Sequence, residues 1–290
     1  MGWTSKSFLN WCVDRLTGAG VDSPGLDSEV LLAGALEVSR EELYLRPDRV
    51  LEEREVTVGR SFVERRMHRE PVAYILGNKA FWDLEFKVDQ NVLTPRPETE
   101  ILIECFLNKA KTYPADFPLR ILDIGTGSGN IAVVAAREFP QSQVTAVDIS
   151  DAALSVAKEN ARLHGVSGRI RFLLSDLFES IPDATFNYIL SNPPYIETDK
   201  IPGLMPDVKC FEPVLALDGG EKGLDVYQRL IFQAHDFLAE TGTLIVEMGE
   251  TQVAGLTQLF KSHGGYTDPE VVQDYGGYDR VMIASKGSHG

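Results

Sequence analysis

The sequence is short of cysteine, of basic charge and of long apolar stretches. Its 290 residues include only three cysteines, Cys12, Cys105 and Cys210, which are far apart and form no CxxC pair. This spacing offers neither a disulfide framework nor a thiolate metal site, and it fits a reducing compartment. No apolar run approaches the roughly 18–20 residues that a membrane span needs, and the N-terminus lacks the apolar core of a signal peptide. We therefore expect a cytoplasmic protein.

Basic side chains are scarce relative to acidic ones. The chain has 28 Lys and Arg against 43 Asp and Glu, a formal charge of −15. Proteins that hold nucleic acid through many phosphate contacts need a surplus of Lys and Arg, so stable nucleic-acid binding is not expected. A basic protein partner is compatible with this charge. The five histidines are scattered and adjoin no motif, and the absence of a ligand cluster predicts no metal site.

The spacing of apolar side chains divides the first 92 residues into a helical part and a strand-like part. Residues 1–75 carry apolar side chains at helical spacing, and Pro24 follows Ser23 where a helix would begin. We predict a small all-helical domain there. Residues 76–92 include an alternation of apolar and polar side chains around Trp82, which predicts a β-hairpin linker.

Strands alternate with helices in the remaining chain, residues 93–290. The alternation starts at ILDIG, residues 121–125, and predicts an α/β fold with a parallel sheet covered by helices on both faces. Ligands of such sheets bind at the carboxyl ends of the strands. Ahead of the first strand, in TPRPETE at 94–100, Pro97 suits the first position of a helix, and the glutamates after it complement the helix dipole.

A glycine-rich turn, DIGTGSG, occupies residues 123–129 after the first of these strands. Glycine lets the backbone approach a ligand closely, and Asp148 ends the next strand, where its carboxylate could accept hydrogen bonds from ribose hydroxyls. The turn reads GxGxG rather than GxGxxG. It fits NAD or S-adenosylmethionine, and a purely structural turn is a third reading. Asp176, after the third strand, could accept from an adenine amine or simply cap the next helix.

A second motif, SNPPYI at residues 191–196, ends the fourth predicted strand. Its two prolines fix φ and remove backbone donors, so the loop is rigid and presents carbonyl oxygens. The side-chain oxygen of Asn192 beside a bare proline carbonyl makes a paired acceptor for an NH2 group, and Tyr195 offers a flat face to a planar amide or amine. Two acceptors stabilise the positive charge that a nitrogen gains as it attacks a methyl sulfonium. A proline-stiffened turn without chemistry is the alternative.

Together the motifs resemble the PrmC/HemK family of glutamine N5-methyltransferases. The resemblance runs from residue 71 to Arg280 and rests on PVAYILG, RPETE and NPPY occurring together, with DIGTGSGNIA, VDIS and EPVLALDGGEKGLDVY in support. NPPY alone is shared with adenine and cytosine amino-methyltransferases. The resemblance implies a class I, Rossmann-like methyltransferase domain with a seven-stranded, mostly parallel sheet, joined by the β-hairpin to the N-terminal helical domain.

The resemblance also implies a reaction. The family transfers a methyl group from S-adenosylmethionine, leaving S-adenosylhomocysteine, to the side-chain amide of the glutamine in the GGQ motif of class-1 peptide chain release factors. We expect a monomer that has the release factor as its partner. The N-terminal domain would dock a basic face of the release factor, which adds specificity, or would merely cover the sheet. Four alternatives stay open, namely a ribosomal-protein glutamine methyltransferase, a DNA adenine methyltransferase, an NAD-linked oxidoreductase and a silent binding protein.

The family's site residues carry over onto this sequence. Those expected to bind the cofactor are Asp123, Ile124, Gly125, Thr126, Gly127, Asp148, Asp176, Leu177 and Asn192. Those expected to hold the substrate glutamine are Asn192, Pro193, Pro194 and Tyr195, with Thr94, Pro95 and Arg96 as one wall of the pocket. The catalytic residues would be Asn192, Pro193 and Tyr195. No general base is expected, because the sulfonium is already a strong electrophile and the protein supplies alignment. Glu247 ends a later strand near this site, with a salt-bridge or capping role as the alternative to a chemical one.

Overall fold

The computed structural model describes residues 2–114, 116–182 and 184–287, which form two compact units. One unit is Met1–Asn78 together with Met205–Phe211, and the other is Lys79–Leu204 together with Glu212–Gly290. The division differs from the predicted boundaries at 75 and 92 in two ways. The hairpin from Lys79 onward groups with the second unit, and the segment Met205–Phe211 from late in the chain groups with the helices.

The first unit is helical, as predicted. Its helices are α1 (Ser5–Gly18), α2 (Pro24–Leu36), α3 (Arg40–Leu45), α4 (Glu53–Met67), α5 (Val72–Leu76) and the short α9 (Pro206–Lys209). Pro24 is the first residue of α2, as its position after Ser23 indicated. An ion-pair cluster explains why the late segment belongs here. The buried Arg66 guanidinium lies 2.7 Å from a carboxylate oxygen of Asp27 and 2.7 Å from one of Asp207.

The second unit contains a seven-stranded sheet with the order β5-β4-β3-β6-β7-β9-β8. The bounds are β3 (Arg120–Ile124), β4 (Gln143–Asp148), β5 (Ile170–Leu174), β6 (Phe186–Ser191), β7 (Leu238–Glu247), β8 (Glu270–Gln273) and β9 (Asp279–Ser285), with the separate hairpin β1 (Asn78–Phe81) and β2 (Leu84–Lys87). Strands β3 to β7 pair in parallel, whereas β9 is antiparallel to both β7 and β8. The predicted mostly parallel α/β sheet is confirmed.

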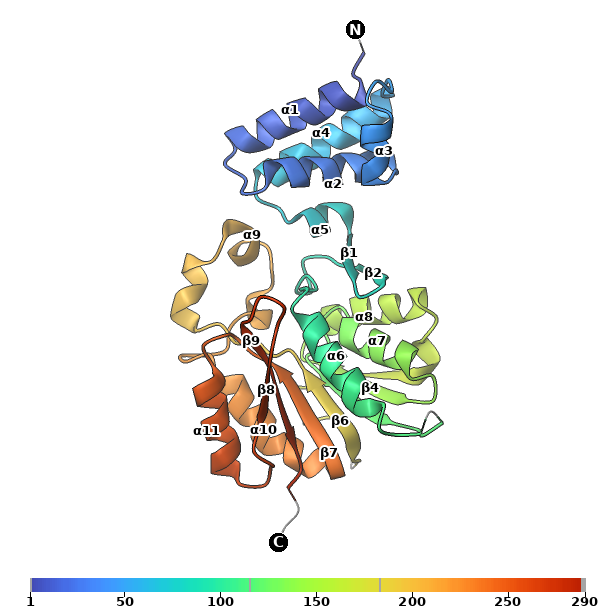
Figure 1. Cartoon of the computed structure of the whole chain (residues 1–290). Helices are drawn as coiled ribbons and strands as arrows, with labels where there is room; N and C mark the ends of the chain where they lie inside the picture. Colours follow the sequence, from blue (N-terminus) through green and yellow to red (C-terminus); the bar gives the residue numbers. More distant parts are fainter. Residues whose placement is uncertain (1, 115, 183, 288–290) are drawn as a thin grey trace. The chain divides into compact units, whose positions relative to one another are not determined.

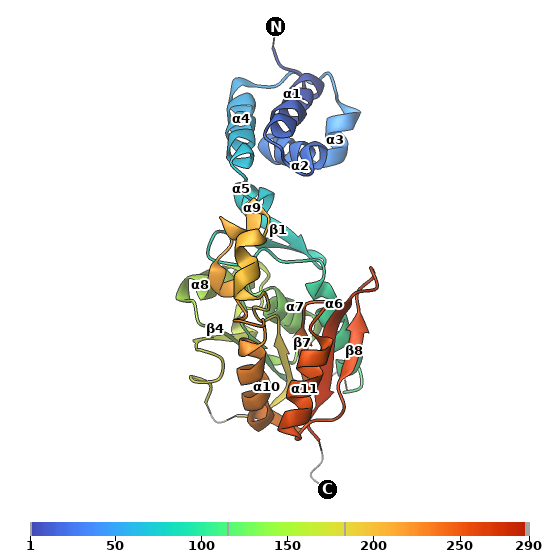
Figure 2. The ribbon, with the colours of Figure 1, turned by 90° about the vertical axis from the view of Figure 1, so that its left-hand side faces the viewer.

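Helices cover both faces of this sheet (Figures 1 and 2). They are α6 (Thr99–Ala110), α7 (Asn130–Glu138) and α8 (Asp151–Leu163) on one face and α10 (Asp225–Phe237) and α11 (Val253–His263) on the other, with 3-10 turns η1 (Ser167–Arg169), η2 (Thr198–Gly203) and η3 (Val214–Ala216). Alternate residues of each strand enter separate cores. Ile121 packs with α6 and α7, whereas its neighbour Leu122 packs with α10 and α11.

One helix start differs from the prediction. Pro97 is not the first residue of a helix, because α6 begins at Thr99 with Glu98 as its N-cap. Residues 96–99 instead form a hydrogen-bonded turn, in which the Thr99 amide donates to the Arg96 carbonyl and the Glu100 amide to the Pro97 carbonyl. Pro97 therefore tightens the chain just before the helix.

The strand order places a crevice in the second unit. From β3 the chain moves outward to β4 and β5 and then returns to the other side of β3 as β6. The carboxyl ends of β3 and β6 therefore flank a switch in strand order, which is where open α/β sheets bind ligands. In the part of the chain that the structure describes, no helix has the length and apolar character that crossing a membrane requires.

Candidate active site

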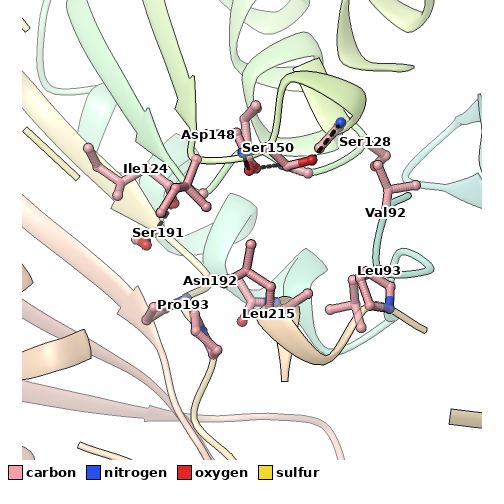
Figure 3. A pocket seen from close by; sticks show the side chains of 18 of the residues that line it. Val92, Leu93, Ile124, Ser128, Asp148, Ser150, Ser191, Asn192, Pro193 and Leu215 are labelled. Atoms are coloured by element: carbon pink, nitrogen blue, oxygen red, sulfur yellow. Dashed lines mark hydrogen bonds between the residues drawn. The ribbon is translucent and has the colours of Figure 1, made fainter. Parts of the chain in front are cut away.

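A pocket of about 260 Å³ opens at this switch point (Figure 3). Its walls come from the glycine turn, the ends of β4 and β5, the loop after β6, and most residues of the segments 91–96 and 213–218. The expected site residues that line it are Ile124, Gly125, Thr126, Gly127, Asp148, Asp176, Leu177, Asn192, Pro193, Pro194, Pro95 and Arg96. Three expected site residues, Thr94, Asp123 and Tyr195, are not part of the lining.

The glycine turn between β3 and α7 adopts backbone angles that residues with a Cβ rarely adopt. Gly125 and Gly127 have φ of 72° and 54°, in the left-handed region, and a Cβ at either position would meet nothing within 4 Å. The backbone conformation, and not crowding, is therefore what requires glycine there. Gly129 differs, because a Cβ there would lie 3.0 Å from the Cβ of Ala157 on α8. The turn thus leaves open space beside its first two glycines and packs closely at the third.

Asp148, the last residue of β4, faces the pocket and holds the turn (Figure 3). Its Oδ2 accepts from the Gly127 amide and its Oδ1 from the Ser150 amide, each at 2.9 Å. Burial raises the pKa of Asp148, and these backbone hydrogen bonds lower it. Each carboxylate oxygen has a second lone pair, so Asp148 can accept from further donors in the pocket, as ribose hydroxyls require.

Asp123 lies beneath the turn and not in the pocket wall. Its side chain is fully buried, Oδ2 accepts from the Thr126 hydroxyl at 2.6 Å, and no described residue donates to Oδ1. Burial raises the pKa of Asp123 to about 7, while the Thr126 hydrogen bond opposes that shift. Asp123 anchors Thr126 in the turn, and its contact with a cofactor stays a prediction.

Asp176 has a partner that the sequence did not indicate. Its carboxylate lies 2.8 Å from the Arg229 guanidinium of α10, and both residues line the pocket. Residues 176–179 form a turn and no helix begins there, so the helix-capping alternative for Asp176 does not apply. The next residue, Leu177, is buried with a φ of 50°, an uncommon conformation for leucine. No local pattern links Asp176 to Arg229, which lies 53 positions further on.

The loop after β6 presents Asn192 and Pro193 to the pocket (Figure 3). The Asn192 Nδ2 donates to the Thr99 hydroxyl at 3.1 Å, and no described residue donates to its Oδ1. The Pro193 carbonyl also receives no hydrogen bond from the described residues. Both oxygens are therefore available, as a paired acceptor for an NH2 group requires.

Tyr195 and the segment 94–96 surround this loop. The Tyr195 carbonyl accepts from Gln252 Nε2 at 3.0 Å, and burial raises the pKa of its phenol to about 12. Arg96 lines the pocket and forms an ion pair of 2.5 Å with the buried carboxylate of Glu212. Thr94 is buried, and no described residue is hydrogen-bonded to its hydroxyl. The substrate roles of Thr94 and Tyr195 stay predictions.

Comparison with solved structures defines the class. A methyltransferase from Pyrococcus furiosus aligns with a TM-score of 0.52 at 19% identity, covering 78% of this chain and 98% of that one. The 16S rRNA N2 G1207 methyltransferase of T. thermophilus, solved with S-adenosylmethionine and guanosine, aligns with a TM-score of 0.52 at 16% identity, covering 72% and 50%. The second unit has the fold of the Rossmann-like, S-adenosylmethionine-dependent methyltransferases.

Sequence comparison identifies the family. The model of the PrmC N-terminal domain matches residues 7–77, and that of the methyltransferase small domain matches residues 97–204. The release factor glutamine methyltransferase of Rhodopirellula baltica is 41% identical over 287 residues, covering 98% of this chain and 97% of that protein. The chain belongs to the release factor glutamine methyltransferase family.

Proposed function

We propose that this protein transfers a methyl group from S-adenosylmethionine to N5 of the glutamine side chain in the GGQ motif of class-1 peptide chain release factors. Its membership of the family supports this reaction. The observation that carries the proposal is the pair of unengaged acceptors at Asn192 and Pro193, placed in a pocket at the switch point of a methyltransferase sheet.

The pocket residues fit the cofactor. When bound, S-adenosylmethionine supplies an electrophilic methyl group on a sulfonium sulfur. Gly125 and Gly127 leave the open space that lets the backbone approach a ligand. Asp148 would hold the ribose hydroxyls through its remaining lone pairs. At the adenine end, Asp176 would accept from the exocyclic amine and Leu177 would supply an apolar surface.

The substrate side chain would enter opposite the methyl donor. Asn192 Oδ1 and the Pro193 carbonyl would each accept one hydrogen of the glutamine NH2 group, which orients the nitrogen. An amide nitrogen is a weak nucleophile and becomes positively charged as it attacks, so two fixed acceptors stabilise the transition state more than the ground state. As the nitrogen–methyl bond forms, the methyl–sulfur bond would break and S-adenosylhomocysteine would leave, and the nitrogen would release one of its two protons to water. The prolines of the loop limit the reorganisation that this requires.

The composition of the chain indicates the compartment and the kind of partner. We place it in the cytoplasm, since all three cysteines are free in the structure and the chain offers no disulfide framework. The charge of −15 favours a basic protein partner and disfavours stable nucleic-acid binding. We expect a monomer whose helical unit docks the release factor, because a glutamine side chain alone distinguishes few proteins.

Mass spectrometry of the GGQ peptide tests the function. An unmethylated release factor is incubated with the protein and S-adenosylmethionine, and a release factor with the GGQ glutamine changed to alanine is the control. We expect one added methyl group on the wild-type glutamine and none on the control. Methylation elsewhere, or no methylation by a protein shown to bind S-adenosylmethionine, would contradict the proposal.

A further inference from the structure

A buried carboxylate, Glu247, lies close to the loop that carries Asn192. Glu247 is the last residue of β7, its side chain is 1% exposed, and no described residue is hydrogen-bonded to Oε2. Strand β7 pairs in parallel with β6 so that Val246 faces Ser191. Glu247 therefore ends its strand at the level where Asn192 follows β6. A buried acid at this place needs an explanation, because a charge away from water is costly unless it is engaged.

A threonine connects this acid to Asn192. Thr99, the first residue of α6, is 2% exposed, and its hydroxyl oxygen accepts from Asn192 Nδ2 at 3.1 Å. Burial raises the pKa of Glu247 to about 7, while hydrogen bonding to the Thr99 and Asn192 side chains and the charge of Arg280 lower it. The three side chains thus form one buried hydrogen-bonding cluster.

The donors and acceptors available on the three side chains decide which group donates each hydrogen bond of the cluster. A carboxylate can only accept hydrogen bonds, so the Thr99 hydroxyl must give its proton to Glu247. The Thr99 oxygen is then left to accept, and the group of Asn192 that can satisfy it is the NH2. The Asn192 oxygen is consequently turned toward the pocket. If the Asn192 amide were flipped, its oxygen would face the Thr99 oxygen and the Glu247 carboxylate, which are acceptors. Its NH2 would then face the NH2 of the substrate, which is a donor.

We propose that Glu247 is a positioning residue that acts directly on the Asn192 NH2 and through Thr99, and so fixes the Asn192 amide with its oxygen toward the substrate nitrogen. This inference rests on the proposed function, since the orientation matters only if Asn192 accepts from an NH2 group. Glu247 itself touches neither the substrate nor the cofactor in this role. Its negative charge is what selects one of the two amide orientations.

Charged and phenolic groups of other elements also surround Glu247. Arg280 of β9, which is paired with Asp274 at 3.1 Å, stays cationic, and Glu98 lies ahead of α6. Tyr227 of α10 donates its phenol proton to the Glu247 main-chain oxygen at 2.6 Å. Burial raises the pKa values of Tyr227 and of Tyr195, so both stay neutral.

A pH dependence follows from this arrangement. As the pH falls through the pKa of Glu247, the carboxyl becomes protonated and can donate a hydrogen bond to Thr99. The Thr99 hydroxyl proton can then point at Asn192, and the Asn192 amide is no longer held in one orientation. The rate is therefore highest when Glu247 is ionised and decreases on the acid side of about pH 7.

Kinetics of four variants test the proposal, with the wild-type enzyme first shown to methylate the GGQ peptide. Thr99→Val should lower kcat roughly tenfold or more, because the amide loses one of the two partners that fix its orientation, and Thr99→Ser should recover most of that loss. Glu247→Gln should lower kcat similarly at pH 8 and should abolish the acid-side decline near pH 7. Glu270→Gln, at an exposed carboxylate paired with Lys109, is the matched control and should change nothing.

A substrate-free readout separates this inference from the proposed function. In the free protein, the side-chain NH2 resonance of Asn192 should shift with a midpoint near pH 7, and this titration should be absent in Glu247→Gln. If the wild-type enzyme does not methylate the peptide, the proposed function is refuted, and the Asn192 titration still tests whether Glu247 controls the amide. Equal kcat values for Thr99→Val and Thr99→Ser, or an unchanged titration in Glu247→Gln, would overturn the role of Glu247.

Discussion

Replacement of Asp148 by alanine should weaken cofactor binding far more than it slows chemistry. In the structure the carboxylate lines the pocket and accepts hydrogen bonds from the main-chain amides of Gly127 and Ser150, with a further one from Ile149. A carboxylate has about four acceptor sites on its two oxygens, so it can also bind ribose hydroxyls. Two ribose hydroxyls bound there would each contribute about 1.5–3 kcal/mol, as hydrogen bonds to a charged group do. The loss of about 3 kcal/mol or more corresponds to at least a ~100-fold increase in the Kd for S-adenosylmethionine.

Titration calorimetry measures this effect directly. The matched control is Asp151→Ala, which removes an exposed carboxylate from the first turn of α8 and should leave the Kd within about twofold. Single-turnover methyl transfer at saturating cofactor should stay within about threefold of the wild-type rate, because Asp148 does not touch the reacting atoms. An unchanged Kd, or a single-turnover rate that falls with the Kd intact, would refute the assignment of Asp148 to the ribose.

Three further predictions concern the turn, the helical unit and a buried acid. Gly127→Ala forces a Cβ into the left-handed region, φ 54°, and should destabilise the fold by about 1–2 kcal/mol and weaken cofactor binding, measured by urea unfolding and calorimetry. Arg66→Ala leaves the carboxylates of Asp27 and Asp207 without their buried cation, and should lower the unfolding free energy by about 3–5 kcal/mol in the same urea experiment. Burial raises the pKa of Asp123 in the folded protein to about 7, above that of an unfolded aspartate, so the folded state binds the proton more tightly. The contribution of Asp123 to the unfolding free energy therefore falls as the pH rises from about 4 to 7. Asp123→Asn should flatten that decline, and an unaltered slope would contradict the raised pKa.

Features that depend on neighbouring residues could be predicted from the sequence. The glycine turn, Asp148 at the end of its strand and the stiff loop at Asn192 are each defined by a few adjacent residues, and the parallel topology then gathers strand ends at one edge of the sheet. The alternation of strands and helices was sufficient for the fold class. Local signals failed at Pro97, where a hydrogen-bonded turn delays the start of α6 by two residues.

Pairs that form only on folding could not be predicted. Asn192 with Thr99, Asp176 with Arg229, and Arg96 with Glu212 are separated by 93, 53 and 116 positions, and no periodicity connects their members. The sequence showed Glu247 near the site but not what it contacts. The segment 205–211 was assigned to the second domain because nothing local marks Asp207 as the partner of Arg66.

The central claim is that the paired acceptors of Asn192 and Pro193 promote methylation of an amide nitrogen. The most direct test is the single-turnover rate of methyl transfer to the GGQ peptide by Asn192→Ala, with the Kd for S-adenosylmethionine measured in the same preparation. The structure predicts a rate lower by about 10²–10³, as expected when one preorganised partner of the transition state is removed, with cofactor binding retained. A near-normal rate with the cofactor bound would contradict the claim.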